Sequence, residues 1–373
     1  MPAMTDINTK RPVVFVGEYL CGGGLRDVSL KSLPETLLAE GQSMWSTLVS
    51  DVAEFADVIT PVDMRFDLKG IDPERSSAVT KVPIEAGGNL WQNWIDLASS
   101  CQHVLVVAPE SDGVLARGVS MMRGAGIDVM VPGGESLRLA SDKRLTARHL
   151  RTEGIASPVT IDDKWLRRSP MAAAMKFVIK PADGCGTTDV RVINDLREAI
   201  DLAEPGEIVQ EFWNGRPASI LIIASPPPAG SSSASVCLLP AVWQTVAGLP
   251  NPREPAMQTY PATLSYDGGQ GPVDPESQRR IQTLALRVLE SLPGSLAGFI
   301  GIDVVLGEDS NHDAVIEINP RLTTSYVGVR QMVGENLARR LFASSEDRVI
   351  TTVAPGSIDW SASGRVRVRA SVV

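Results

Sequence analysis

Short apolar runs alternate with helical patterns along the first third of the chain. Residues 13–17 form a β-branched run that ends at a glycine, which indicates a buried strand. From Leu33 to Val49 the apolar residues recur at the spacing of an amphipathic helix. The same reasoning predicts further strands over 57–61, 103–108 and 127–131 and helices over 90–99 and 114–122. Strands that alternate with helices are typical of parallel βαβ units, so residues 1–135 are predicted to form an open α/β lobe.

The pattern changes after about residue 136. A helix is predicted over 141–151, and it is followed by strand and helix patterns over 177–181, 189–193, 195–202 and 207–212. Strands predominate from there on, over 219–224, 235–243, 298–306, 313–319 and 365–369, with helices predicted over 275–292 and 326–341. We therefore expect two α+β lobes after the first lobe, over residues 136–209 and 210–373.

Composition and charge narrow the classes of function. An apolar fraction of 43% and a charged fraction of 21% are ordinary for a globular protein. The net charge of −9 argues against non-specific nucleic-acid binding, which needs clustered Lys and Arg. Because the chain has neither an apolar run of about 18 residues nor an N-terminal h-region, we expect no membrane span and no secretory signal. Four scattered cysteines without CxxC spacing fit a reduced, cytoplasmic setting.

Two apolar strands each carry a carboxylate where the pattern predicts an apolar residue. Asp303 lies in one of them and Glu317 in the next. A buried charge is costly without a partner or a metal ion. Glu317 and Asn319 are two residues apart and share one face of their strand, and Asp303 joins them if the two strands form a hairpin. Three oxygen ligands suit Mg²⁺, while an ion pair between Glu317 and Arg321 is the structural alternative.

A lysine and a glycine-rich turn mark the end of the strand predicted at 177–181. Lys180 lies at this strand end, and the segment Asp183-Gly-Cys-Gly-Thr187 follows it. Glycines let backbone N–H groups approach phosphate oxygens, and a lysine supplies a point charge for phosphate. The alternative is a hairpin tip that needs glycine, with a solvated lysine. The strand at 207–212, which runs into a turn, is a weaker candidate for holding an adenine edge.

Together these segments resemble the ATP-grasp superfamily. Their order over residues 130–345 agrees with it: Asp142-Lys143 on a helix, Lys180 with its glycine loop, Gln210-Glu211-Phe212, Asp303, and Glu317-Ile-Asn319-Pro-Arg321. The resemblance implies an ATP-grasp fold, in which an N-terminal open α/β (Rossmann-like) lobe precedes two α+β lobes that clamp ATP. It also implies ATP and two Mg²⁺ ions as cofactors, with Mn²⁺ as a substitute.

The same resemblance implies roles for individual residues. The ATP phosphates are expected to contact Lys143 and Lys180 and to be covered by Gly184, Gly186 and Thr187. Adenine is expected to be held by the hinge residues Gln210, Glu211, Phe212 and Trp213. The expected metal ligands are Asp303, Glu317 and Asn319, with Glu317 bridging the two ions.

Two positions depart from relatives of the D-alanine–D-alanine ligase type. Pro217 stands about where those relatives carry an acidic residue for the ribose, and Gly301 stands where they carry an arginine. Arg321 is the natural candidate to stabilise the transition state instead, as in carboxylase-like relatives that share an Asn-Pro-Arg segment. The expected catalytic residues are therefore Arg321, for the oxyanion of a tetrahedral intermediate, and Lys180.

Further segments resemble the tyramine–glutamate ligase family of methanofuran biosynthesis. They are Gly17-Glu18-Tyr19, Glu40-Gly41-Gln-Ser-Met44, Ala108-Pro-Glu-Ser-Asp-Gly113, Leu139-Ala-Ser-Asp-Lys143 and Glu317-Ile-Asn-Pro-Arg-Leu-Thr-Thr324. This resemblance implies an ADP-forming ligase for small-molecule carboxylate and amine substrates, which joins the amine of tyramine to the γ-carboxyl of glutamate through an acyl phosphate. Many relatives are dimers, which makes a homodimer an option by analogy.

Two carboxylates in the N-terminal lobe are candidates for the amine site. Glu18 and Glu110 follow predicted strand ends, where open α/β sheets bind ligands. We expect one or both to bind the substrate ammonium; the alternative is a capping or solvated carboxylate. Two other functions stay open, an ATP-grasp carboxylase or phosphoryl transferase and a non-catalytic nucleotide-binding module. The latter would require loss of a key ligand, and the expected ligands are present.

Overall fold

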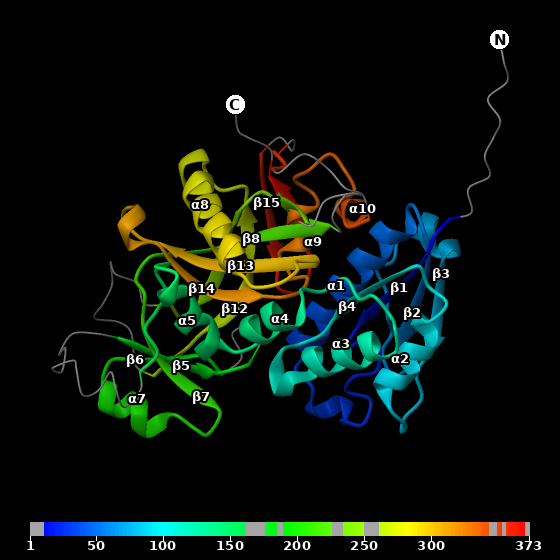
Figure 1. Ribbon diagram of the computed structural model, residues 1–373, viewed down its shortest axis with the longest axis horizontal. Coiled ribbons are helices and arrows are strands. Elements are labelled where there is room, and N and C mark those ends of the chain that lie inside the picture. The colour runs from blue at the N-terminus through cyan, green and yellow to red at the C-terminus, as the bar shows by residue number, and fades with distance from the viewer. Residues whose placement is uncertain are drawn as a thin grey trace, which may run out of the picture.

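The computed structural model describes residues 11–161, 176–184, 189–225, 234–249, 261–342, 349–352 and 356–369. Its N-terminal lobe is built on a parallel four-stranded sheet of order β3-β2-β1-β4, at the right of Figure 1. The strands are β1 (Val13–Glu18), β2 (Asp57–Val62), β3 (Val79–Pro83) and β4 (His103–Val107). The predicted fold class of this lobe, an open α/β sheet, is thus confirmed. No helix in the described ranges is long and apolar enough to cross a membrane.

Alternate residues of β1 bury against helices on opposite faces of this sheet. Val14 and Val16 belong to the cluster formed with α1 (Glu35–Ala53). Phe15 packs instead with the helices on the other face, α2 (Leu90–Ala98) and α3 (Val114–Gly124). A central parallel strand must be apolar on both faces, which is why residues 13–17 read as a continuous apolar run.

The sequence was wrong about one strand of this lobe and silent about another. The segment predicted as a strand at 127–131 forms only a single bridge, between Val129 and Val104. The edge strand is β3, which has exposed side chains and therefore no apolar pattern to reveal it. Short 3-10 turns complete the lobe at Leu30–Ser32, Pro73–Ala78 and Ser111–Gly113.

A smaller antiparallel sheet, of order β11-β6-β5-β7, forms the central lobe at the lower left of Figure 1. Two helices lead into it, α4 (Gly134–Ala140) and α5 (Lys143–Thr152), where the sequence predicted one. The strands are β5 (Phe177–Pro181), β6 (Arg191–Ile193), β7 (Glu207–Glu211) and β11 (Ala262–Thr263), with α7 (Leu196–Leu202) packed against them. Strand β7 continues two residues past the expected lobe boundary at 209, and β11 joins the sheet from much later in the chain.

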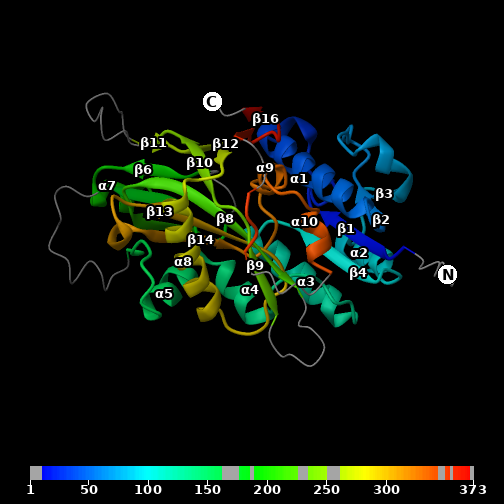
Figure 2. The same cartoon turned by 90° about the horizontal axis from the view of Figure 1, so that it is seen from above.

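The C-terminal lobe is an eight-stranded sheet, of order β14-β13-β8-β10-β12-β15-β16 with β9 paired to β8. Its strands are β8 (Arg216–Ser225), β9 (Ser235–Leu238), β10 (Val242–Ala247), β12 (Ser265–Gly271), β13 (Gly298–Leu306), β14 (Ala314–Asn319), β15 (Ser357–Ser361) and β16 (Val366–Arg369). Helix α8 (Pro275–Ser291) covers one face, as Figure 2 shows from above, and a 3-10 turn at Ser310–His312 joins β13 to β14.

The helix predicted over 326–341 is two short helices, α9 (Tyr326–Val329) and α10 (Leu337–Arg340). Asn336 caps the second helix by accepting the Arg339 N–H, and its side-chain amide donates to the Asp51 carbonyl at 2.7 Å. The Asp51 carboxylate on α1 also accepts the Tyr326 hydroxyl at 2.7 Å and the Arg330 Nε at 2.9 Å. The residues around this break therefore bind the C-terminal lobe to the N-terminal lobe through Asp51.

Candidate active site

Strands β13 and β14 pair as an antiparallel hairpin, the condition on which the sequence argument for a shared site depended. Asp303 lies directly opposite Glu317, and Gly301 lies opposite Asn319. The Asn319 side-chain amide donates to Asp303 Oδ2 at 3.0 Å, and Gln244 Nε2 on β10 donates to Asp303 Oδ1 at 2.9 Å. The three expected metal ligands therefore meet on one face of two neighbouring strands.

The site concentrates negative charge in a partly buried position. Burial is the main cause that raises the pKa of Asp303 to about 6, and repulsion by Glu317 adds to it. Hydrogen bonds from Ser219 and Asn319 and the charge of Arg321 act in the opposite direction. Like charges that share a buried site favour a cation between them.

Lys143 connects three parts of the site. Its Nζ lies 3.0 Å from Glu317 Oε1 and also donates to the Gly184 carbonyl. Its backbone N–H donates to the Ala182 carbonyl at 2.8 Å. Glu317 is therefore partnered by Lys143, whereas the alternative from the sequence was a pair with Arg321.

Lys180, the second expected phosphate lysine, is buried at the end of β5. Burial lowers its pKa to about 8, and the nearby charge of Lys143 acts in the same direction. Glu317 and Asp303 oppose this shift, so all four charged groups lie within electrostatic range of one another. The two buried lysines could bind the phosphates of a polyanion, and the two carboxylates could bind the metal ion that accompanies it.

The root of the glycine loop is fixed by the N-terminal lobe. Asp183 accepts the backbone N–H of Asp112 at 2.8 Å, and Asp112 itself has a φ of 54°. A side chain at Gly184 would lie 2.8 Å from Pro181, so the turn packs tightly there. Gly186 and Thr187, which were expected to cover the phosphates, lie outside the described residues.

The hinge, residues 210–213, already forms several hydrogen bonds with other parts of the protein. The Gln210 side chain is buried and donates to Thr160 Oγ1 at 3.0 Å. The Glu211 N–H donates to the Val159 carbonyl at 3.1 Å, and the Phe212 N–H to the Lys176 carbonyl at 2.8 Å. The Trp213 indole donates to the His312 carbonyl at 2.7 Å. These two backbone N–H groups are thus not available to an adenine edge, and the adenine role of the hinge stays a prediction.

The two candidate amine carboxylates differ in their surroundings. Glu110 is 4% exposed and receives Arg321 through both oxygens, at 2.9 Å from Nε and 3.1 Å from Nη2. Glu18 is buried at the end of β1, and its Oε2 accepts the Cys21 N–H at 2.7 Å. Burial raises the pKa of Glu18, against the opposing hydrogen bonds from Cys21 and the charge of Arg321. Arg321 thus links the N-terminal lobe to the metal-site hairpin.

The structure adds residues that were not among the expected site residues. Glu40 on α1 is half-buried and lies within electrostatic range of Arg321. Tyr266 on β12 lies near both Glu40 and Asp303, and the Trp360 indole donates to its hydroxyl at 3.2 Å. A polar Gln244 on an otherwise apolar face of β10 was a detectable signal, whereas Glu40 was named only as the first residue of a segment that resembles the ligase family, without a role.

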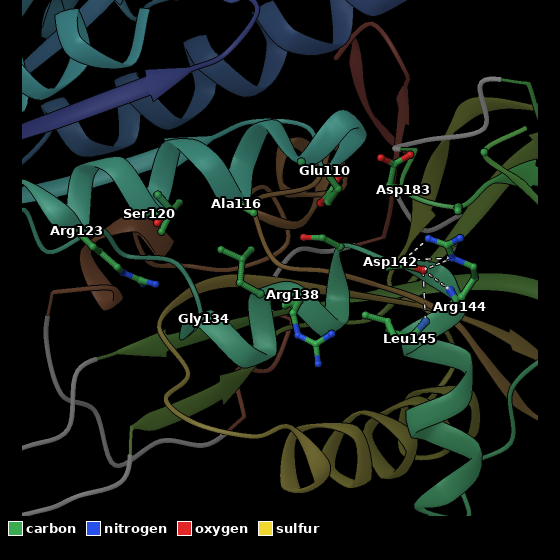
Figure 3. Close-up of a pocket in the computed structure, with 16 residues that line it drawn as sticks. Glu110, Ala116, Ser120, Arg123, Gly134, Arg138, Asp142, Arg144, Leu145 and Asp183 are labelled. Carbon is green, nitrogen blue, oxygen red and sulfur yellow. Dashed lines mark hydrogen bonds and ion pairs between the residues drawn. The ribbon is translucent and has the colours of Figure 1, made fainter.

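A pocket of about 660 Å³ opens beside this centre. Figure 3 shows Arg123 of α3 at one end, and Asp183 and Arg144 at the other. Glu110 and Asp142 also line it. The pocket therefore reaches the glycine loop and the carboxylate that holds Arg321, which makes it a candidate path for a small molecule.

The close packing at Gly301 explains one departure from the D-alanine–D-alanine ligase type. A Cβ at this position would lie 2.6 Å from the Thr323 methyl group and 3.4 Å from Asn319 Cβ. Any side chain at this position would therefore require the Thr323 side chain to move. The second departure, Pro217, lies within β8 opposite Val305.

Comparison with known families covers most of the chain. Residues 140–325 match the ATP-grasp domain family, and residues 56–134 match the pre ATP-grasp 3 domain family. The chain is 23% identical to the tyramine–L-glutamate ligase of Methanocaldococcus jannaschii over 318 residues, which are 84% of this chain and 83% of that ligase.

Solved structures agree on the fold. A putative ATP-grasp superfamily protein from Archaeoglobus fulgidus superposes with a TM-score of 0.63 at 19% identity, over 94% of this chain and 92% of that one. The N5-carboxyaminoimidazole synthetase of Staphylococcus aureus, solved with ADP, gives a TM-score of 0.64 at 14% identity, over 96% and 84% of the two chains.

Proposed function

The chain belongs to the ATP-grasp superfamily and is an ATP-dependent carbon–nitrogen ligase, and on this premise we propose that it joins a carboxylate to an amine through an acyl phosphate. The observation that carries the proposal is the charge arrangement around Glu317. Its carboxylate faces Asp303 across the hairpin and binds Lys143 at 3.0 Å, with Lys180 buried alongside. Paired lysines and paired carboxylates suit a nucleoside triphosphate bound together with a divalent cation.

Mg²⁺ fits the residues at this site. Asp303 and Glu317 offer carboxylate oxygens, Asn319 offers an amide oxygen, and hard oxygen ligands of this kind suit Mg²⁺ together with phosphates. Burial is the main cause of the raised pKa of Asp303 and repulsion by Glu317 adds to it, a cost that a cation would relieve. Among the described residues no three His, Cys, Asp or Glu side chains cluster closely enough to hold a metal ion by themselves, so the phosphates would have to complete the coordination. When bound, Mg²⁺ would neutralise charge on the transferred phosphoryl group.

The chemistry proceeds in two balanced steps. A substrate carboxylate oxygen attacks the γ-phosphorus, the bond to the β-phosphate oxygen breaks, and an acyl phosphate and ADP result. The amine nitrogen then attacks the acyl carbon, and inorganic phosphate leaves. Lys143 and Lys180 hold the phosphate charge, and exclusion of water protects the acyl phosphate from hydrolysis. Arg321, oriented by Glu110, stabilises the oxyanion of the tetrahedral intermediate.

We propose glutamate as the acid and tyramine as the amine. The support is the M. jannaschii relative, which is named tyramine–L-glutamate ligase and matches 84% of this chain. The amine would approach from the N-terminal lobe, where Glu18 and Glu110 flank Arg321. A cationic ammonium favours such an acidic recess. The pocket beside Glu110 is the proposed path of entry.

An ADP-release screen of amines against amino acids tests the proposal, starting with tyramine and glutamate. We expect ADP and phosphate only when ATP, Mg²⁺, an acid and an amine are all present, together with an amide of the matching mass. ADP release that depends on bicarbonate and needs no amine would identify a carboxylase instead. ADP release with an acid alone, at the rate seen with both substrates, would identify a phosphoryl transferase.

A further inference from the structure

The pocket beside Glu110 is lined by two helices, α3 of the N-terminal lobe and α4, which leads into the central lobe. Ala116, Ser120 and Arg123 line it from α3, and Figure 3 shows these side chains one after another along the helix. Leu137 lines it from α4. Residues 116 and 123 are seven apart, so at the rise of an α-helix this wall is about 10 Å long. The pocket is therefore large enough to hold a small molecule along its length.

Three carboxylates line the pocket at its inner end, the end that reaches the glycine loop, and two of them are paired. Both oxygens of Glu110 receive Arg321. Asp142 holds Arg144, with Nε 3.0 Å from Oδ1 and Nη2 2.6 Å from Oδ2. Asp183 lies within electrostatic range of Arg144, but within the part of the chain that the structure describes it forms no ion pair. The inner end therefore carries the net negative charge of Asp183.

Asp183 is connected to the metal-site hairpin through a short series of contacts. Its Oδ2 accepts the Asp112 N–H at 2.8 Å, and among the described residues its Oδ1 accepts no hydrogen bond. The carbonyl of the next residue, Gly184, accepts Lys143 Nζ, which lies 3.0 Å from Glu317 Oε1. A cation bound at Asp183 Oδ1 would thus lie beside the expected phosphate site.

The rest of the pocket is apolar in its middle and rich in hydrogen-bond donors at its outer end. The apolar residues that line it are Ala116, Val119, Leu137, Leu145 and Ala182. At the outer end the Arg123 guanidinium donates to backbone carbonyls of residues 129, 131 and 132 and forms no ion pair with a described residue. This order of charge, apolar surface and donors suits an amine that carries an apolar body with an oxygen at its far end.

We infer that this pocket is the binding site of the amine substrate, with the ammonium on Asp183 and the apolar body between α3 and α4. This inference rests on the proposed ligase function. It assigns the specificity for a charged amine to Asp183 and the specificity for an aromatic or other apolar body to Ala116 and Leu137. Tyramine has both features, and its phenol oxygen would lie toward Arg123.

The chemistry of the walls favours the amine over the acid as the occupant. An aromatic ring gains free energy when it leaves water for an apolar surface, whereas the polar groups of glutamate would lose hydration there. An ammonium ion also gains from a carboxylate that has no other cationic partner. Glu110 offers less to the ammonium, because Arg321 already occupies both of its oxygens.

The first test is Asp183→Asn, which removes the charge but keeps an oxygen that can accept the Asp112 N–H. We expect KM for tyramine to rise at least about tenfold, as for loss of one charge-assisted contact, with KM for glutamate and Kd for ATP unchanged. Asp201→Asn, at an exposed position on α7 of the same lobe, is the matched control and should leave all three values unchanged.

The second test is Ala116→Leu, which narrows the pocket without changing a charged group. We expect KM for tyramine to rise about tenfold, because the larger side chain would overlap the bound ring, again with KM for glutamate unchanged. Ala125→Leu, at an exposed position after α3 and outside the pocket, is its control. This variant decides the question if Asp183→Asn does not fold.

Each outcome bears on a different statement. An unchanged KM for tyramine in both variants would overturn the assignment of the pocket. A raised KM for glutamate in place of tyramine would overturn it as well, because the pocket would then hold the acid. Equal losses of ATP and tyramine affinity in Asp183→Asn would show that Asp183 positions the glycine loop and does not bind the amine. Failure of the wild-type protein to form any amide in the screen would overturn the ligase proposal itself.

Discussion

Arg321 holds Glu110 through a two-pronged contact, with Nε 2.9 Å from one carboxylate oxygen and Nη2 3.1 Å from the other. The two residues come from different lobes, Glu110 from the loop after β4 and Arg321 from the loop after β14. Both side chains are at most 10% exposed. A planar guanidinium fork fixes its partner in direction as well as distance. This contact therefore fixes the position of the loop after β4 relative to the metal-site hairpin.

We predict that breaking this pair from one side destabilises the protein strongly. Glu110→Gln and Arg321→Met should each lower the free energy of unfolding by about 3–5 kcal/mol, because each leaves a buried charge without this partner. The double variant should lose less than the sum of the two. Urea unfolding of the four proteins measures the coupling. Additive losses would mean that the contact contributes no coupling.

Glu317→Gln should leave a folded protein with little ATP turnover. Glu317 faces Asp303 and Lys143, and a neutral amide would reduce the negative charge that attracts the cation. We expect kcat for ADP release to fall about 10²–10³-fold, as for loss of one preorganised electrostatic group. Glu308→Gln, at an exposed position after β13, is the control. Wild-type turnover in Glu317→Gln would refute the assignment of this residue as a metal ligand.

Lys180→Met should weaken ATP binding without weakening the fold. Burial lowers the pKa of Lys180, which means that the folded protein bears a cost for keeping this ammonium charged at neutral pH. A methionine of similar length removes both the cost and the phosphate contact. We expect at least about a tenfold rise in Kd for ATP by calorimetry, equivalent to about 1.4 kcal/mol, with unfolding free energy unchanged or higher. The exposed Lys69→Met variant provides the comparison. Equal ATP affinity in the two variants would contradict the role of Lys180.

The stability difference between wild type and Glu40→Gln should grow with pH. Burial on folding raises the pKa of Glu40 from its usual value of about 4.5 to about 7, so the folded state favours the protonated form. Wild type therefore loses stability as pH rises from about 4.5 through 7, while the glutamine variant has nothing to titrate at this position. Urea unfolding should find the variant more stable by about 1–3 kcal/mol at pH 8 and by much less at pH 5. A difference that does not change with pH would mean that Glu40 is not perturbed by folding.

The sequence by itself determined the local elements and the chemistry that they carry. A β-branched run specified β1, and period-two alternation put Glu317 and Asn319 on one face, because side chains of a strand alternate between faces. The same local logic predicted the strands that carry Asp303 and Glu317 and placed Lys180 at a strand end. Each of these features is encoded within a few consecutive residues, where spacing alone fixes direction.

Only the tertiary structure decided which of these groups meet. The pairs Lys143–Glu317 and Arg321–Glu110 join residues far apart in the chain, and no local period records such a contact. Only lobe packing half-buries Glu40 within electrostatic range of Arg321, which its place in a family-like segment did not reveal. The same limit explains the wrong predictions. Apolar residues at 127–131 bury against other elements without forming a ladder, and the helix at 326–341 breaks where Asn336 binds Asp51 on the opposite lobe.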